Sequence, residues 1–162
     1  MNFLKRLFGR KEEPAELPPE FLQEDSPDWL IDMKGAALPH GSRFSIRVQI
    51  LDATRAGTVE IIVLPRKEGE EPRSASGALA QTEIDRLFVI LGFSFPGDIA
   101  NVPALVIDGM PVSISIHRHE PYAMAAGECN LAGWTDSRKP GPPVIEIGKI
   151  LLEARNRILP AS

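Results

Sequence analysis

The sequence predicts an α+β fold in which one antiparallel sheet of four to five strands packs against three helices. Two segments with strict alternation of apolar and polar residues, Phe44 through Ile50 and Val112 through Ile116, predict strands with one buried and one solvated face. A third segment, from Val144 to Leu159, has apolar residues three and four positions apart. This spacing predicts a helix that covers the apolar side of the sheet.

The length of 162 residues suits one domain, and 43% apolar with 25% charged residues is ordinary globular composition. The formal net charge of −4 provides no broad positive field, so we expect no nucleic-acid binding. The only cysteine, Cys129, has no partner for an internal disulfide, which favours a reducing compartment. No apolar run approaches the ~18 residues of a membrane-spanning helix, and the first residues do not resemble a signal peptide. We therefore expect a cytoplasmic protein.

Residues 1–11 form a short cationic amphipathic segment. If residues 2–8 are helical, apolar side chains share one side and basic ones lie opposite: Phe3, Leu4, Leu7 and Phe8 against Lys5 and Arg6. Such a segment can contact a partner protein or lie peripherally on an anionic membrane, where each basic residue contributes about 1 kcal/mol. The alternatives are a frayed terminus or a segment docked on the chain's own core.

An acidic linker is predicted for residues 12–25, ahead of a single α+β domain over residues 26–162. No Lys or Arg occurs between Glu12 and Asp32, and the first part is kept extended by Pro14, Pro18 and Pro19. The linker would separate the basic tip from the body of the protein.

The first predicted helix spans residues 26–35. Ser26 suits the N-cap, Pro27 the first helical position and Gly35 the end of the helix. Its buried stripe would consist of Trp29, Leu30 and Met33.

Two strands follow, at residues 43–50 and 58–64. The connection between them is short, which permits an antiparallel hairpin but no parallel crossover. Residues 67–80 are charged and then rich in small side chains, a composition that predicts a mobile surface loop.

The central helix is predicted over residues 84–91, packed on the sheet. Thr82 and Asp85 resemble a capping box at its start, and Gly92 marks its end. After the helix, the core would be extended by Phe93 and Phe95.

A second hairpin is predicted from residues 104–107 and 112–116, because Asp108 and Gly109 supply the positive φ angles of a type I′ turn. Pro111 cannot donate a ladder hydrogen bond, which favours an edge position for its strand. A further strand is expected within residues 122–131.

The last helix follows a proline-rich connector at residues 139–143. Its apolar stripe comprises Val144, Ile147, Leu151, Ala154 and Ile158. The resulting order of elements is helix, two strands, helix, two or three strands, helix. This order resembles that of the profilin, longin and roadblock group of folds, and the resemblance implies a scaffold or adaptor on membranes or in regulatory complexes.

His117 and His119 are the candidate metal ligands. On a strand that continues from Val112, both imidazoles would share a face, and two residues of spacing allows them to hold one ion. A zinc or iron site needs a third ligand, for which the candidates are Cys129, Glu128 and Glu120. An exposed polar sheet face explains the same histidines.

Catalytic signatures are absent from the sequence. The surroundings of Cys129 offer neither a nucleophile elbow nor a helix start that would lower the thiol pKa, so we expect a small, partly buried residue there. The chain has no glycine-rich phosphate loop and no nucleotide fingerprint. We predict no cofactor and favour a protein that is not an enzyme.

Arg43 and Arg47 project from one side of the predicted strand 43–50, where Arg118 could join them. Two or three cations are typical of a solvated face rather than a phosphate site. Trp134 would plug the edge of the core or contact a ligand or partner.

The leading hypothesis from the sequence is a non-enzymatic interaction domain. It would act as an accessory subunit or adaptor, binding another protein through a sheet edge or a helix face. The alternatives are a metal-binding protein or metal-dependent enzyme that uses His117 and His119, and a small-ligand sensor with its pocket between the sheet and the central helix.

Overall fold

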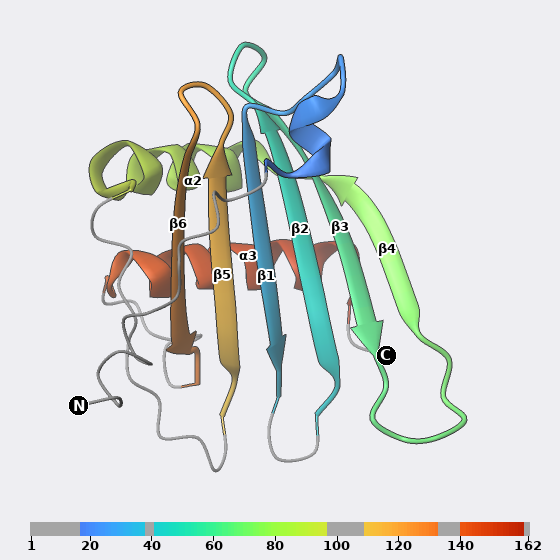
Figure 1. The fold of residues 1–162 in the computed structure, drawn as a ribbon. Coiled ribbons are helices and arrows are strands. Elements are labelled where there is room, and N and C mark those ends of the chain that lie inside the picture. The colour runs from blue at the N-terminus through green and yellow to red at the C-terminus, as the bar shows by residue number, and fades with distance from the viewer. Residues whose placement is uncertain (1–16, 38–40, 97–108, 133–139, 161–162) are drawn as a thin grey trace, which may run out of the picture.

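The computed structural model describes residues 17–37, 41–96, 109–132 and 140–160. Their strands form one antiparallel sheet in the order β4-β3-β2-β1-β5-β6 (Figure 1). The strands are β1 (Trp29–Ala36), β2 (Arg43–Leu51), β3 (Ala56–Leu64), β4 (Arg73–Ala78), β5 (Pro111–Arg118) and β6 (Ala123–Asn130). The described helices are the 3-10 helix η1 (Pro19–Leu22) and two α-helices, α2 (Gln81–Ser94) and α3 (Pro143–Ile158).

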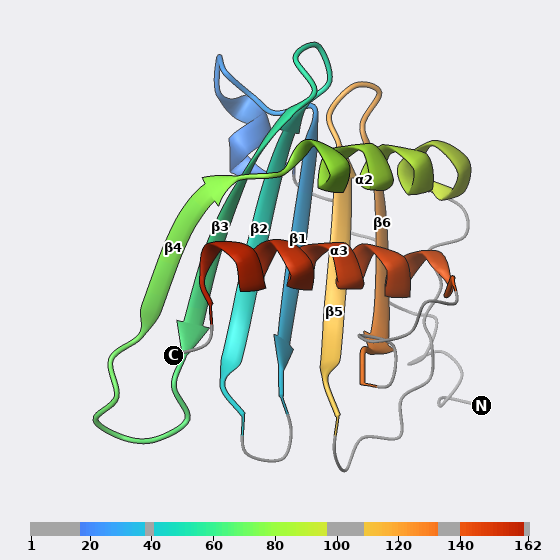
Figure 2. The same cartoon turned by 180° about the vertical axis from the view of Figure 1, so that it is seen from behind.

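Both α-helices cross the same face of the sheet, and η1 lies on the other side near one end (Figures 1 and 2). We call these the helix-covered face and the open face. On the helix-covered face, Ile31 lies opposite both Val48 and Ile116, and all three side chains are fully buried. The expected stripe of α3 packs there, with Val144, Ile147, Leu151 and Ala154 buried. The hydrophobic core is therefore one-sided.

Several predicted elements are confirmed. The strands expected at 43–50, 58–64 and within 122–131 correspond to β2, β3 and β6, and the helices at 84–91 and 144–159 correspond to α2 and α3. The alternation of each strand arises because one face meets the helices and the other meets solvent.

The helix predicted over residues 26–35 is wrong, because this segment contains β1. Its backbone pairs with β2 on one side and with β5 on the other, which satisfies its N–H and C=O groups in both directions. Trp29 and Met33 are buried on the helix-covered face, and Leu30 is buried on the open face. Burial on both sides produces a short continuous apolar run, which periodicity cannot distinguish from a helical turn.

The surface loop predicted over residues 67–80 is also wrong in part, because it contains β4. This strand pairs with β3 and has only small side chains after Arg73. A side chain at Gly77 would meet Ile158 of α3 at 3.2 Å, so small residues there allow the helix to approach. β4 lacks the apolar alternation that identifies a strand because it carries no large apolar side chain on either face.

The fold class therefore differs from the expected one. The described residues form a sheet of six strands with two α-helices, in the order strands, helix, strands, helix, instead of four to five strands with three helices. The order resembling profilin, longin and roadblock folds began with a helix, and that resemblance is not retained.

Two smaller corrections concern the place of β5 in the sheet and the exposure of Phe93. β5 lies between β1 and β6, not at an edge, and Pro111 is tolerated because it is the first residue of the strand. Phe93 is 88% exposed, so it does not extend the core, whereas the ring of Phe95 packs on Trp29.

The start of α2 also lies earlier than predicted. The Glu83 carboxylate accepts the backbone N–H of Ala80 at 2.8 Å, so the helix is capped ahead of Thr82. The predicted strand at 104–107 lies outside the described residues. Neither α-helix in the described part of the chain is long and apolar enough to cross a membrane.

Candidate functional site

β6 is the outermost strand on one side of the sheet, and no strand of the described residues pairs with its outer side. The N–H of Leu131, just after β6, donates to the carbonyl of Met110 at 2.9 Å. Because backbone bonding alternates along an antiparallel ladder, Ala125 and Gly127 bond to β5. The backbone groups of Met124, Ala126 and Glu128 consequently point away from the sheet. We call this row the β6 edge.

The β6 edge has few of the features that usually protect an outermost strand. Within Ala123–Asn130 the only charged residue is Glu128, and there is no proline and no lysine. Most of its side chains are small, at Ala123, Ala125, Ala126 and Gly127. An added strand would therefore find outward-directed backbone groups and room for its own side chains.

α2 carries an exposed apolar ridge, which consists of Val89 and Phe93. The C-terminal end of α2 extends past β6 in both views (Figures 1 and 2). Val89 and Phe93, four residues apart on one side of the helix, are 60% and 88% exposed. Because the buried Leu87 and Leu91 face the sheet, this ridge points away from it, and exposed apolar side chains of this kind are typical of an interaction surface.

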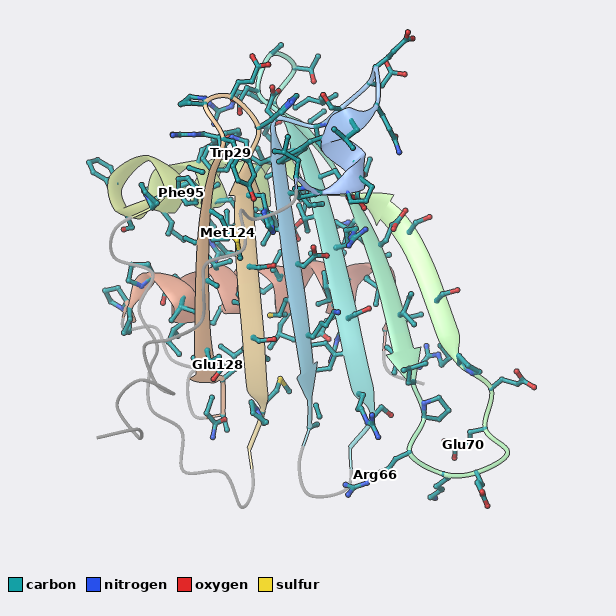
Figure 3. All side chains as sticks on the ribbon, viewed as in Figure 1. Trp29, Arg66, Glu70, Phe95, Met124 and Glu128 are labelled. Atoms are coloured by element: carbon teal, nitrogen blue, oxygen red, sulfur yellow. The ribbon has the colours of Figure 1, made fainter. Side chains whose placement is uncertain are left out.

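On the open face, a hollow of about 540 Å³ reaches the same edge. It is lined by residues of β1, β2, β5 and β6, including Asp32, Lys34, Arg47, Ser113, Ser115, Ala126 and Glu128. Figure 3 shows Met124 and Glu128 spaced along β6. The lining is polar and carries both signs of charge.

The charges in this hollow are organised around Arg47. Its Nε donates to Asp32 Oδ1 at 2.8 Å, and its guanidinium also pairs with Glu20 of η1. The hydrogen bond that Arg47 donates to Asp32 raises the pKa of Arg47 above its ordinary value. Arg47 thus ties η1 to the sheet. Arg43 is exposed and is the first residue of β2. Arg118 lies opposite Trp29 on the helix-covered face, so it does not join Arg43 and Arg47.

The two histidines have separate partners. His117 Nδ1 lies 3.3 Å from the Tyr122 hydroxyl, and burial lowers its pKa below the ordinary value. His119 Nδ1 lies 3.2 Å from Ser26 Oγ, and its ring stacks on Phe21 at 4.8 Å. Among the described residues, no three His, Cys, Asp or Glu side chains are grouped so as to hold a metal ion.

Cys129 faces away from the histidines. It lies opposite Val112 in the register, on the helix-covered face, whereas His117 lies opposite Met124 on the open face. The side chain is 2% exposed, and burial raises the pKa of its thiol to about 11. In this arrangement Cys129 neither completes a metal site with His117 nor acts as a nucleophile near neutral pH.

Comparison with known proteins adds no family to this geometry. No protein-family model matches the chain, and no curated protein matches it at a significant level. The candidate site consequently depends on the structure alone.

The tip residues Phe3, Leu4, Lys5, Arg6, Leu7 and Phe8, together with Trp134, lie outside the described residues. Sequence reasoning missed the exposure of Val89 and Phe93, because an apolar helix indicates burial when its neighbours are unknown. A usable signal was the small side chains of residues 123–127, which leave space beside a strand.

Proposed function

We propose that this chain is a non-enzymatic interaction domain that binds an extended segment of a partner protein as an added strand along the β6 edge. In this role it serves as an accessory subunit or adaptor in an intracellular complex. The observation that carries the proposal is the outward-pointing backbone of Met124 and Ala126 on a strand edge that has few protective side chains.

The two sides of the β6 edge specify the chemistry of the partner. On the helix-covered side, an added strand would lie beside Ala125 and Gly127, whose small size leaves room for bulky apolar side chains. On the open side it would border the hollow that contains Lys34 and Arg47, which suits polar or charged side chains. We therefore infer a partner segment in which apolar and polar residues alternate.

The location and the second contact remain part of the proposal. The amphipathic pattern of residues 1–11 supports an additional contact with the partner or with an anionic membrane surface, and the single cysteine supports a cytoplasmic setting. Deletion of residues 1–11 would remove this additional contact and leave the one at β6 in place, so the two contributions to binding can be measured separately.

The experiment is a matched pair of proline variants at the two edges of the sheet. Ala126→Pro removes an outward N–H from β6 and leaves the bonds to β5 in place. Ser76→Pro does the same at β4: Leu79 N–H bonds to Gly57 O, so the backbone of Ser76 points outward there. Tagged proteins are recovered from source cells and their partners quantified by mass spectrometry.

We expect Ala126→Pro to reduce recovery of the wild-type partner at least about tenfold, whereas Ser76→Pro leaves it unchanged. Equal recovery by wild type and Ala126→Pro would contradict the proposal. Light scattering of the purified protein tests whether a second copy of this chain, instead of a separate partner, binds at the β6 edge. A wild-type dimer that Ala126→Pro dissociates would assign the edge to a second copy of this chain and refute a separate partner.

A further inference from the structure

A second cleft lies between α2 and one end of β1 and β5, on the helix-covered face. Its volume is about 360 Å³, close to the lower end of the range for small-molecule pockets. The residues that matter for its chemistry are Trp29, Asp52, Arg55, Phe88, Phe95 and Arg118. Figure 3 shows Trp29 and Phe95 near each other at this end of the molecule.

Aromatic rings form the walls of the cleft. The rings of Trp29 and Phe95 meet edge to face, with centroids 5.1 Å apart and planes at 76°. The Trp29 indole N–H donates to Asp52 Oδ1 at 2.9 Å, which satisfies its only polar group and fixes its orientation. The walls are therefore held in place without a ligand.

Two guanidinium groups lie against these walls. Arg55 stacks over Phe88 at 4.7 Å, and Arg118 lies 5.4 Å from the centre of Phe95 and 5.9 Å from that of Trp29. Arg55 is paired with Asp85 at 2.9 Å. Positive charge at an aromatic face is stabilised by the ring quadrupole, so both cations are positioned rather than free in solvent.

Arg118 has no carboxylate partner among the described residues. Its Nε donates to the carbonyl of Pro121 at 3.1 Å, which leaves the two terminal nitrogens of the guanidinium. The side chain is half-buried. The paired N–H groups of a guanidinium match a carboxylate or a phosphate group. Arg55 and Arg118 line the cleft together with Asp52, and Asp85 pairs with Arg55, so Arg118 is the cation of the lining whose terminal nitrogens a ligand can use.

We propose that this cleft binds a small organic anion, with the acidic group on Arg118 and an apolar part packed against the rings of Trp29, Phe88 and Phe95. This site is separate from the β6 edge, since its lining comes from β1, β5, α2 and the segment between β2 and β3 and includes no residue of β6. It makes the domain a ligand-responsive module in addition to an interaction domain.

The indole N–H signal of Trp29 reports on the cleft directly. The chain has 2 tryptophans, so a Trp134→Phe background leaves Trp29 as the only indole in a nitrogen-15 NMR spectrum. Benzoate, phenyl phosphate and neutral benzamide are titrated separately. We expect saturating shifts with at least one of the anions, and binding of benzamide at least about tenfold weaker. Tighter binding of phenyl phosphate assigns a phosphate ligand, and tighter binding of benzoate a carboxylate.

Variants at Arg118 provide the second readout. Arg118→Gln should weaken anion binding at least about tenfold, and Arg118→Lys, which keeps the charge but loses the fork, at least about threefold. Arg86→Gln is the matched control, because Arg86 pairs with Glu153 away from the cleft and should not change binding. Anion shifts that do not saturate, equal binding of benzamide, or unchanged affinity in a folded Arg118→Lys protein would overturn the proposal.

Discussion

Glu83 has two structural tasks at the start of α2. Its carboxylate accepts the Ala80 N–H at 2.8 Å and pairs with Arg157 of α3 at 2.8 Å, while the side chain is only 5% exposed. One side chain therefore caps a helix and joins the two helices that cover the sheet. Removal of a buried partner leaves the remaining groups unsatisfied, which costs more than the contact itself contributes.

We predict that Glu83→Ala lowers the free energy of unfolding by about 2–3 kcal/mol, measured by urea denaturation followed by circular dichroism. Glu153→Ala is the control, because the pair of Glu153 with Arg86 is exposed and should contribute less than about 1 kcal/mol. Losses of equal size in the two variants would show that burial of Glu83 has no special effect.

At the scale of elements, sequence patterns identified those strands whose two faces differ. β2 was predictable because Phe44, Ile46 and Val48 face the helices while the residues between them are less buried. β1 was not, because Leu30 on the open face is as buried as Ile31 on the other, and alternation is lost. β4 was missed for the opposite reason, since it contributes no large apolar side chain to either face.

Substitutions in α2 can distinguish the effect of a side chain on stability from its effect on partner binding. Because Phe93 is 88% exposed, we predict that Phe93→Ser changes the free energy of unfolding by less than about 0.5 kcal/mol and reduces partner recovery at least about fivefold. Leu87→Ala in the same helix should cost about 2–5 kcal/mol, because Leu87 is fully buried. Denaturation curves and partner recovery are compared for both variants. A large loss of stability in Phe93→Ser would place this ring in the core instead.

At the scale of the molecule, long-range pairing determines which surfaces remain available. The pairing of Trp29 with Arg118 joins β5 to β1 across more than half of the chain and leaves β6 outermost. Local patterns carry no information on that pairing, so the sequence predicted a single antiparallel sheet but not its edge strands. The candidate site could not be predicted for the same reason, because its outward N–H groups exist only when β6 is last in the sheet.

The same topology explains why two binding surfaces can coexist. The β6 edge uses backbone groups at the side of the sheet, whereas the cleft at Arg118 uses side chains between α2 and the sheet. α2 lines the cleft through Phe88, whereas Phe93 of the same helix is exposed to solvent.

Amide hydrogen exchange at β6 tests the central claim most directly. In the isolated protein, Ala126 should exchange roughly a hundredfold or more faster than its neighbours Ala125 and Gly127, whose N–H groups bond to β5. In the complex with the recovered partner, Ala126 should become as protected as they are. An Ala126 amide that is already protected in the isolated monomer, or that stays unprotected in the complex, would contradict an open strand edge as the binding site.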